Sequence, residues 1–150
     1  MWRHPMATPS RVGKAATGGR EAEADAKIAD VSADDYDALV IPGGQINPDL
    51  LRVDEDVLEL VRAFHDQGKT IAAVCHAPWV LIEAGVLKGR DATSYHSIKT
   101  DVINAGANWK DEAVVVDQAI ITSRQPNDLK AFVAKIVEEI EEGKHARKAA

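Results

Sequence analysis

Residues 70–84 read TIAAVCHAPWVLIEA, and they join an apolar run to a helix-like segment through Cys75, the only cysteine of the chain. Thr70–Val74 is a continuous run of small and β-branched residues, which is typical of a strand buried on both faces. Pro78 suits the first turn of a helix, where its missing N–H costs no hydrogen bond. This stretch therefore predicts a strand, a sharp turn at Cys75 and a helix over residues 76–84.

The same alternation of strand and helix continues on both sides. Further buried strands are predicted at Asp37–Pro42 (DALVIP), Ala113–Asp117 and Ala119–Ser123. Helices are predicted from an Asp54 cap to Gly68, over Ser97–Ala105 with Ser97 as the cap, and along an apolar stripe that begins at Leu129 and ends at Gly143. Strands that alternate with helices indicate an α/β fold with a largely parallel sheet.

Two of the predicted strands end in residues suited to a functional site. Asp37–Pro42 is followed by the glycine pair Gly43-Gly44, and Thr70–Val74 is followed by Cys75. Sites in parallel sheets lie at the carboxyl ends of the strands, so these residues are expected close together.

Composition limits the class of protein. The chain has 150 residues, which is enough for one domain. Its formal net charge is −6, whereas nucleic-acid-binding domains are typically basic. No apolar run is long enough to cross a bilayer, and one cysteine forms no intramolecular disulfide, so we expect a cytoplasmic protein with no membrane or nucleic-acid partner. We predict a disordered tail over residues 1–24, an α/β domain over 25–143 and a basic tail over 144–150.

The surroundings of Cys75 resemble a nucleophile elbow, in which small residues stand two positions before and after the nucleophile. Here those residues are Ala73 and Ala77. The following helix N-terminus favours a thiolate, and His76 supplies a base or an imidazolium beside it. The alternative is a buried structural thiol, because free cysteine is among the most buried residue types.

At this point the chain resembles a known family. The segment from DDYDALVIPGG (34–44) through TIAAVCHAPWVL (70–81), TSYHSIKTDVINAGANW (93–109) and ITSRQPNDLKAF (121–132) is similar to the PfpI family of cysteine-peptidase-like stress proteins. The resemblance covers about residues 24–140. It implies a flavodoxin-like α/β fold related to class I glutamine amidotransferases, assembly as dimers or hexamers, and no cofactor. Family members are described as peptidases, as cofactor-independent glyoxalases or as deglycases.

The resemblance also implies roles for individual residues. Cys75 matches the nucleophile and His76 its neighbouring histidine. Gly43 and Gly44 match a turn whose backbone N–H groups form an oxyanion hole together with the amide after the cysteine, which glycine allows by its close backbone approach.

Two more positions carry a role by resemblance. Glu55 matches a glutamate that reaches the histidine of a neighbouring subunit, although an acid in a first helical turn is favoured by the helix dipole alone. Tyr95 matches an active-site tyrosine. Trp79 and Trp109 are expected to be packing residues, His96 is given no role, and the histidine spacing implies no metal.

The chain departs from the family pattern in two places. Ala77 replaces a glycine that commonly follows the Cys-His pair. Residues 1–24 hold no apolar run to match the family's first strand or the glutamate after it. We therefore expect an N-terminally truncated form of the fold, in which the first strand is either encoded upstream of this sequence or lost from the protein, and in which Asp37–Pro42 is left as an edge strand.

The predicted function is that of a cysteine-dependent stress-response enzyme. Its substrates would be small carbonyl compounds, peptides or glycated proteins. The alternatives are a non-enzymatic redox sensor that acts through Cys75 and an inactive truncated relative. A glutamine amidotransferase is set aside, because the His-x-Glu pair of that class is absent after the elbow.

Overall fold

The structure is a computed structural model that describes residues 24–143. The tails predicted over residues 1–24 and 144–150 lie outside these described residues, apart from Ala24. The α-helices are α1 (Ile46–Leu51), α2 (Glu55–Asp66), α3 (Pro78–Glu83), α4 (Lys99–Asn104) and α5 (Leu129–Glu142). The strands are β1 (Ala38–Ile41), β2 (Thr70–Val74), β3 (Asp91–Ala92), β4 (Asn108–Trp109), β5 (Val114–Asp117) and β6 (Ile120–Ser123). Short 3-10 turns are η1 (Ile28–Asp30), η2 (Ala33–Asp35), η3 (His96–Ile98) and η4 (Pro126–Asp128).

The main sheet has the strand order β1-β2-β6-β5. The β1–β2 and β2–β6 pairs are parallel, and the β5–β6 hairpin is antiparallel. This arrangement confirms the predicted α/β class with a mostly parallel sheet. A second, two-stranded parallel sheet of β3 and β4 was not predicted, because two-residue strands leave no periodic signal in the sequence.

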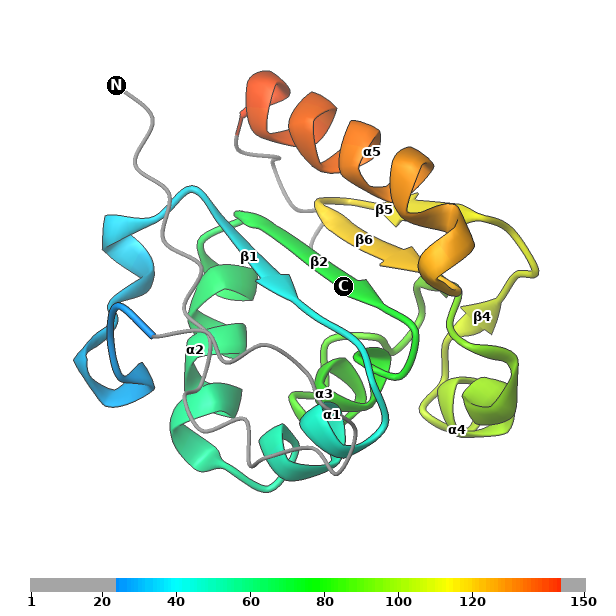
Figure 1. Ribbon diagram of the computed structural model, residues 1–150, viewed down its shortest axis with the longest axis horizontal. Coiled ribbons are helices and arrows are strands. Elements are labelled where there is room, and N and C mark those ends of the chain that lie inside the picture. Colours follow the sequence, from blue (N-terminus) through cyan, green and yellow to red (C-terminus); the bar gives the residue numbers. More distant parts are fainter. Residues whose placement is uncertain (1–23, 144–150) are drawn as a thin grey trace.

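Helices cover both faces of the sheet (Figure 1), with α5 on one face and α1, α2 and α3 on the other. The strand β2 is buried along its whole length, and its side chains alternate between two apolar clusters. Ile71 and Ala73 pack into the cluster of α2 and α3, while Ala72 and Val74 pack into the cluster of α5. A continuous apolar run is therefore needed here, because both faces of the strand are covered.

The starts of two helices show where a local sequence signal predicted a helix cap correctly and where it did not. Asp54 caps α2 as predicted, since its side chain accepts hydrogen bonds from the backbone N–H groups of Asp56 and Val57. The predicted cap at Ser97 is wrong. Ser97 lies inside η3, the helix α4 begins after Ile98, and the Ser97 hydroxyl bonds instead to a side chain of the site described below.

The strand β1 lies at one edge of the sheet within the described residues, as the sequence predicted for Asp37–Pro42. It pairs with β2, and Val40 lies beside Ala72 on the α5 side of the sheet. Val40 remains 36% exposed, since α5 packs chiefly on β2, β5 and β6. Within residues 24–143, no helix combines the length and apolar character that a bilayer span requires.

Candidate active site

The backbone holds Cys75 in the conformation of a nucleophile elbow. Its φ of 66° lies in the left-handed region, which residues with a side chain rarely adopt. The Cys75 N–H donates to Ser123 O at the end of β6 (2.9 Å), and the Cys75 carbonyl accepts from the Tyr95 N–H (2.9 Å). The thiol is half-buried. The strain is thus fixed by bonds to two other segments, as is common at functional sites.

The glycine turn after β1 lies directly against this elbow. A Cβ on Gly43 would stand 2.7 Å from Cys75 Cβ and 2.9 Å from the carbonyl oxygen of Val74. Only glycine allows this approach, and Gly44, with φ +82°, needs glycine for its backbone conformation. The structure therefore brings together the three residues that the sequence proposed for attack and oxyanion binding.

His76 contacts the thiol with one ring nitrogen and a hydroxyl with the other. Cys75 Sγ lies 3.2 Å from His76 Nδ1, and His76 Nε2 lies 3.1 Å from Ser97 Oγ. Burial, and then repulsion from His96, hold the pKa of His76 below its ordinary value of 6.5. The ring is therefore neutral at neutral pH, which suits a base for the thiol proton.

Aromatic rings surround the imidazole of His76. The Tyr95 ring stacks on it at a centroid distance of 5.0 Å, and the Trp79 ring meets it edge-on at 5.2 Å. The indole N–H of Trp79 donates to Asp101 on α4 (2.8 Å). Tyr95 thus lies at the site as predicted, and Trp79 packs against the imidazole from another side. These contacts restrict the rotation of the imidazole.

Glu55 is the first residue of α2, and its carboxylate bonds to Arg62 at 2.7 Å. Its side chain is 66% exposed, and among the described residues it makes no hydrogen bond to His76. Its predicted role concerns a neighbouring subunit, which a single chain does not test. That role stays a prediction.

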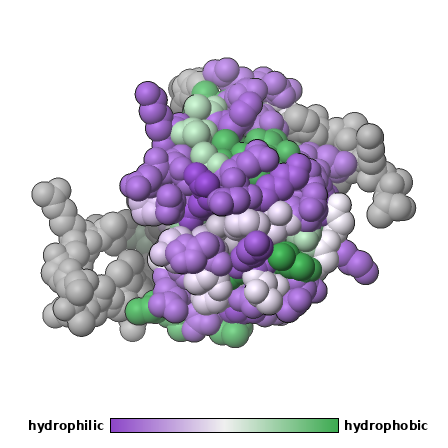
Figure 2. All heavy atoms as spheres, turned by 90° about the vertical axis from the view of Figure 1, so that its right-hand side faces the viewer, coloured by the Kyte–Doolittle hydropathy of each residue, from purple (hydrophilic) through white to green (hydrophobic). Residues whose placement is uncertain are grey.

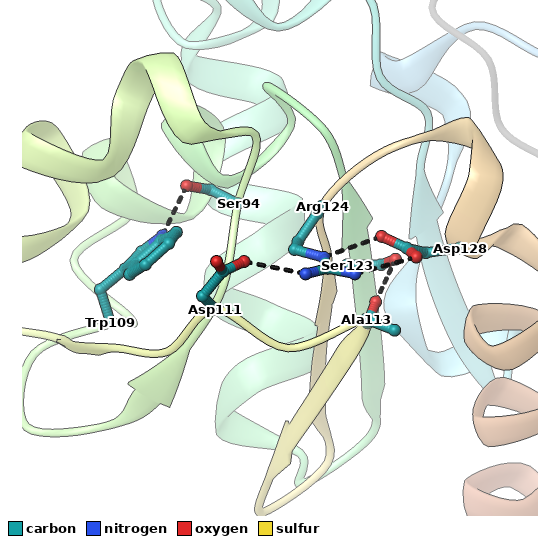
Figure 3. Close-up of polar contacts among 7 residues, drawn as sticks. All are labelled: Ser94, Trp109, Asp111, Ala113, Ser123, Arg124 and Asp128. Atoms are coloured by element: carbon teal, nitrogen blue, oxygen red, sulfur yellow. Dashed lines mark hydrogen bonds and ion pairs between the residues drawn. The ribbon is translucent and has the colours of Figure 1, made fainter.

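Two serines tie the site to the strands below it (Figure 3). Ser123 donates through its hydroxyl to Ala113 O at 2.7 Å, and its own carbonyl holds Cys75. Ser94 accepts from the indole N–H of Trp109 at 3.0 Å and donates to Tyr95 O. The loop that carries Tyr95 is therefore anchored to Trp109 through Ser94 and to the Cys75 carbonyl through the Tyr95 N–H.

Arg124 follows Ser123 and links three segments (Figure 3). It bonds to Asp128 at 3.0 Å and to Asp111 at 2.8 Å, and these bonds raise its pKa above the ordinary value. Because both carboxylates bind the guanidinium, Arg124 joins the end of β6 to the start of α5 and to the segment that carries Asp111. No group of three or more His, Cys, Asp or Glu side chains in residues 24–143 is arranged to hold a metal ion.

The sequence missed three residues of the site. Ser97 was expected to cap a helix, His96 was given no role, and Asp101 was not considered. Each reaches the site from the loop after β3 or from α4, about 20 residues along the chain from Cys75, so no local spacing signals the contact. The predicted match at Tyr95 was the only pointer to this loop.

Comparisons with known proteins agree with this geometry. The DJ-1/PfpI family matches residues 7–139 of the chain. The putative cysteine protease YraA of Bacillus subtilis is 50% identical over 129 residues, which are 85% of this chain and 76% of that protein. The deglycase PfpI of Pyrococcus furiosus is 44% identical over 119 residues, which are 79% of this chain and 71% of that protein.

Two more relatives extend the picture. General stress protein 18 of Bacillus subtilis is 47% identical over 120 residues, covering 79% of this chain and 69% of its own length. A solved structure from Anabaena variabilis, a two-domain protein with DJ-1/ThiJ/PfpI-like and ferritin-like domains, matches 79% of this chain with a TM-score of 0.77 and 44% identity. The chain spans about a third (34%) of that two-domain protein.

Proposed function

Because the chain belongs to the DJ-1/PfpI family and its lone thiol contacts a neutral histidine at a strained elbow, we propose that Cys75 is a nucleophile for carbonyl carbon. The single observation that carries this proposal is the sequence of contacts from Cys75 Sγ through the imidazole of His76 to Ser97. Enzymatic activity is also named among the relatives, as a putative cysteine protease and as deglycases.

The first step is activation of the thiol. His76 Nδ1 accepts the proton of Cys75 Sγ across 3.2 Å, which leaves a thiolate and an imidazolium. Nδ1 can accept only in the tautomer that carries its proton on Nε2, and the Nε2–H group can donate to Ser97 Oγ at 3.1 Å. Ser97 therefore acts as the positioning residue that favours the reactive tautomer.

The second step is addition to the carbonyl group. The thiolate forms a C–S bond, and the π electron pair of the C=O group moves to oxygen. The backbone N–H groups of the Gly43-Gly44 turn and of His76 are the proposed donors to this oxyanion. The imidazolium of His76 then gives its proton to the oxyanion, so an aldehyde is converted to a neutral hemithioacetal.

We favour an α-oxoaldehyde, or its adduct with an amine, as the substrate class. Addition to an aldehyde needs only a thiol, a base and oxyanion donors, for which Cys75, His76 and the Gly43-Gly44 turn are the proposed groups. For turnover, the hemithioacetal then moves its C1 proton to C2, and water hydrolyses the resulting thioester, which releases a 2-hydroxy acid and the free thiol. Peptide cleavage needs water in the same way and, in addition, protonation of a leaving amine. The relative named a putative cysteine protease keeps peptides as the second candidate.

The test combines thiol reactivity with turnover. Because Cys75 is the only cysteine, iodoacetamide labelling reports on it alone. We expect native protein to label faster than urea-unfolded protein near neutral pH, and to consume methylglyoxal catalytically. His76→Asn is expected to slow both reactions, and Cys75→Ala to abolish both.

Ser97→Ala isolates the positioning contact. Loss of one hydrogen bond is expected to lower kcat by roughly three- to tenfold with little change in KM. Thr100→Ala removes a nearby exposed hydroxyl and is the matched control. Equal labelling of native and unfolded protein would refute an organised site, and fast labelling without any turnover would favour the redox-sensor alternative.

A further inference from the structure

A cavity of about 230 Å³ lies at the end of the main sheet opposite to Cys75. It is lined by Asp37, Lys69, Thr70, Glu139, Ile140 and Gly143. Thr70 is the first residue of β2 and Cys75 follows its last residue, so extended chain of roughly 16 Å separates them. Figure 2 views the molecule from the side toward which β2 and β6 point in Figure 1, and the cavity lies at the other end of β2. The cavity is therefore separate from the candidate active site.

Three segments of the chain meet at this cavity, namely the starts of β1 and β2 and the end of α5 (Figure 1). Lys69, Thr70 and Glu139 are buried, with 7%, 3% and 7% of their surface exposed. Asp37 and Gly143 are exposed, so the cavity opens to solvent beside them. A single water molecule needs only about 10–15 Å³ of cavity volume, so a small organic molecule has room here.

The lining of the cavity is electronegative. Asp37 and Glu139 contribute two carboxylates, and Lys69 contributes one ammonium group. That ammonium group already donates to the backbone carbonyls of Ala33 (2.5 Å) and Tyr36 (2.7 Å), which occupy two of its three N–H groups. The last carbonyl groups of α5 add the partial negative charge of a helix C-terminus. A positively charged ligand is therefore favoured.

The surroundings of the carboxylates favour an organic cation over a metal ion. Within residues 24–143, Asp37 and Glu139 belong to no group of three or more metal-ligating side chains. Ile140 gives the cavity an apolar wall, against which methylene groups can pack. Lys135 also attracts Glu139, but its ammonium group is hydrogen-bonded to Glu138.

We propose that this cavity is a binding site for a short aliphatic amine. Its ammonium group binds the carboxylates of Glu139 and Asp37, and its methylene groups lie against Ile140. The same chemistry has a second source in the chain itself, because Lys144, Arg147 and Lys148 follow Gly143 in the sequence. The experiment below distinguishes an added amine from these side chains.

Isothermal titration calorimetry of the full chain with putrescine tests the site. We expect wild type to bind the diamine, and Glu139→Gln to raise the dissociation constant at least tenfold, because a buried charged acceptor is lost. Asp37→Asn is expected to raise it roughly threefold, because Asp37 is exposed. Asp35→Asn removes an exposed carboxylate that does not line the cavity, and it is the matched control with an unchanged constant.

The variant Lys144→Ser/Arg147→Ser/Lys148→Ser identifies the source of the cation. An affinity for putrescine equal to that of wild type assigns the site to a free amine, and an affinity at least threefold higher assigns it to the chain's own basic side chains. Both results support a cation site.

Circular dichroism and the iodoacetamide labelling rate of Cys75 verify that each variant is folded. We expect both to match wild type, so failure of this proposal is distinguishable from failure of the proposed active site. The amine site is overturned if neither wild type nor the triple variant binds putrescine, or if Glu139→Gln and Asp37→Asn both bind it like wild type. It is also overturned if succinate or magnesium ions bind as tightly as putrescine, because the proposed contacts select an organic cation.

Discussion

Replacing Gly43 with alanine tests the close packing on which the site depends. The added Cβ would stand 2.7 Å from Cys75 Cβ and 2.9 Å from Val74 O, whereas carbon atoms in contact lie about 3.5–4.0 Å apart. Neither neighbour is a flexible side-chain end. Cys75 is held at both its N–H and its carbonyl, so the two turns must separate by about 1 Å.

Two terms decide the size of the effect. Forced overpacking costs about 1–3 kcal/mol. Gly43 does not have a left-handed φ, so alanine adds no backbone strain to the folded protein. Alanine also lowers the conformational entropy of the unfolded chain, which stabilises the folded protein by about 0.4–1 kcal/mol and offsets part of the loss. We expect a net loss of about 1–2 kcal/mol, measured by urea unfolding with tryptophan fluorescence, together with a changed labelling rate of Cys75 in the folded protein.

Gly89→Ala is the control, because Gly89 also lies in a turn but a Cβ added there would meet no atom within 4 Å. Its φ of +74° predicts a loss of stability of about 1 kcal/mol with an unchanged labelling rate of Cys75. If Gly43→Ala is as stable as wild type and labels at the same rate, the contact between the glycine turn and the elbow is refuted.

Three further predictions concern pH and the core. The pKa of His76 is lowered on folding, so below about pH 6.5 the unfolded chain binds more protons than the folded one, and the free energy of unfolding should fall as pH drops below that value. An equal fall of the urea midpoint with pH in His76→Asn would contradict this prediction. Leu81→Ala should cost about 2–5 kcal/mol, because Leu81 on α3 is fully buried in the core, and a thermal midpoint near wild type would argue against that packing. Thr122→Val should lower the free energy of unfolding in urea by about 1–3 kcal/mol, because the buried N–H of Thr93 loses the Thr122 hydroxyl as its acceptor at 2.8 Å. An unchanged free energy of unfolding would contradict this role of the Thr122 hydroxyl.

Local patterns were sufficient for the fold class and for the centre of the site. Thr70–Val74 could be recognised as a doubly covered strand, and Asp54 as a cap from its place before an apolar helical stripe. The glycine pair and Cys75 were placed together by one rule, that parallel strands end at the same edge of the sheet. Each of these signals lies within a few residues of the feature it predicts.

The tertiary structure alone decided the groups that act on His76. Ser97 looked like a helix cap, and only the fold of the loop after β3 turns its hydroxyl toward Nε2. The neighbouring His96 likewise lowers the pKa of His76 only because that loop returns over the elbow. The sequence by itself determined which strands form the main sheet and that a thiol stands at its carboxyl edge, since both follow from local periodicity and turn chemistry. The contacts of the His76 ring and the lowering of its pKa were decided by segments about 20 residues apart, because such contacts depend on how the segments pack and leave no periodic trace along the chain.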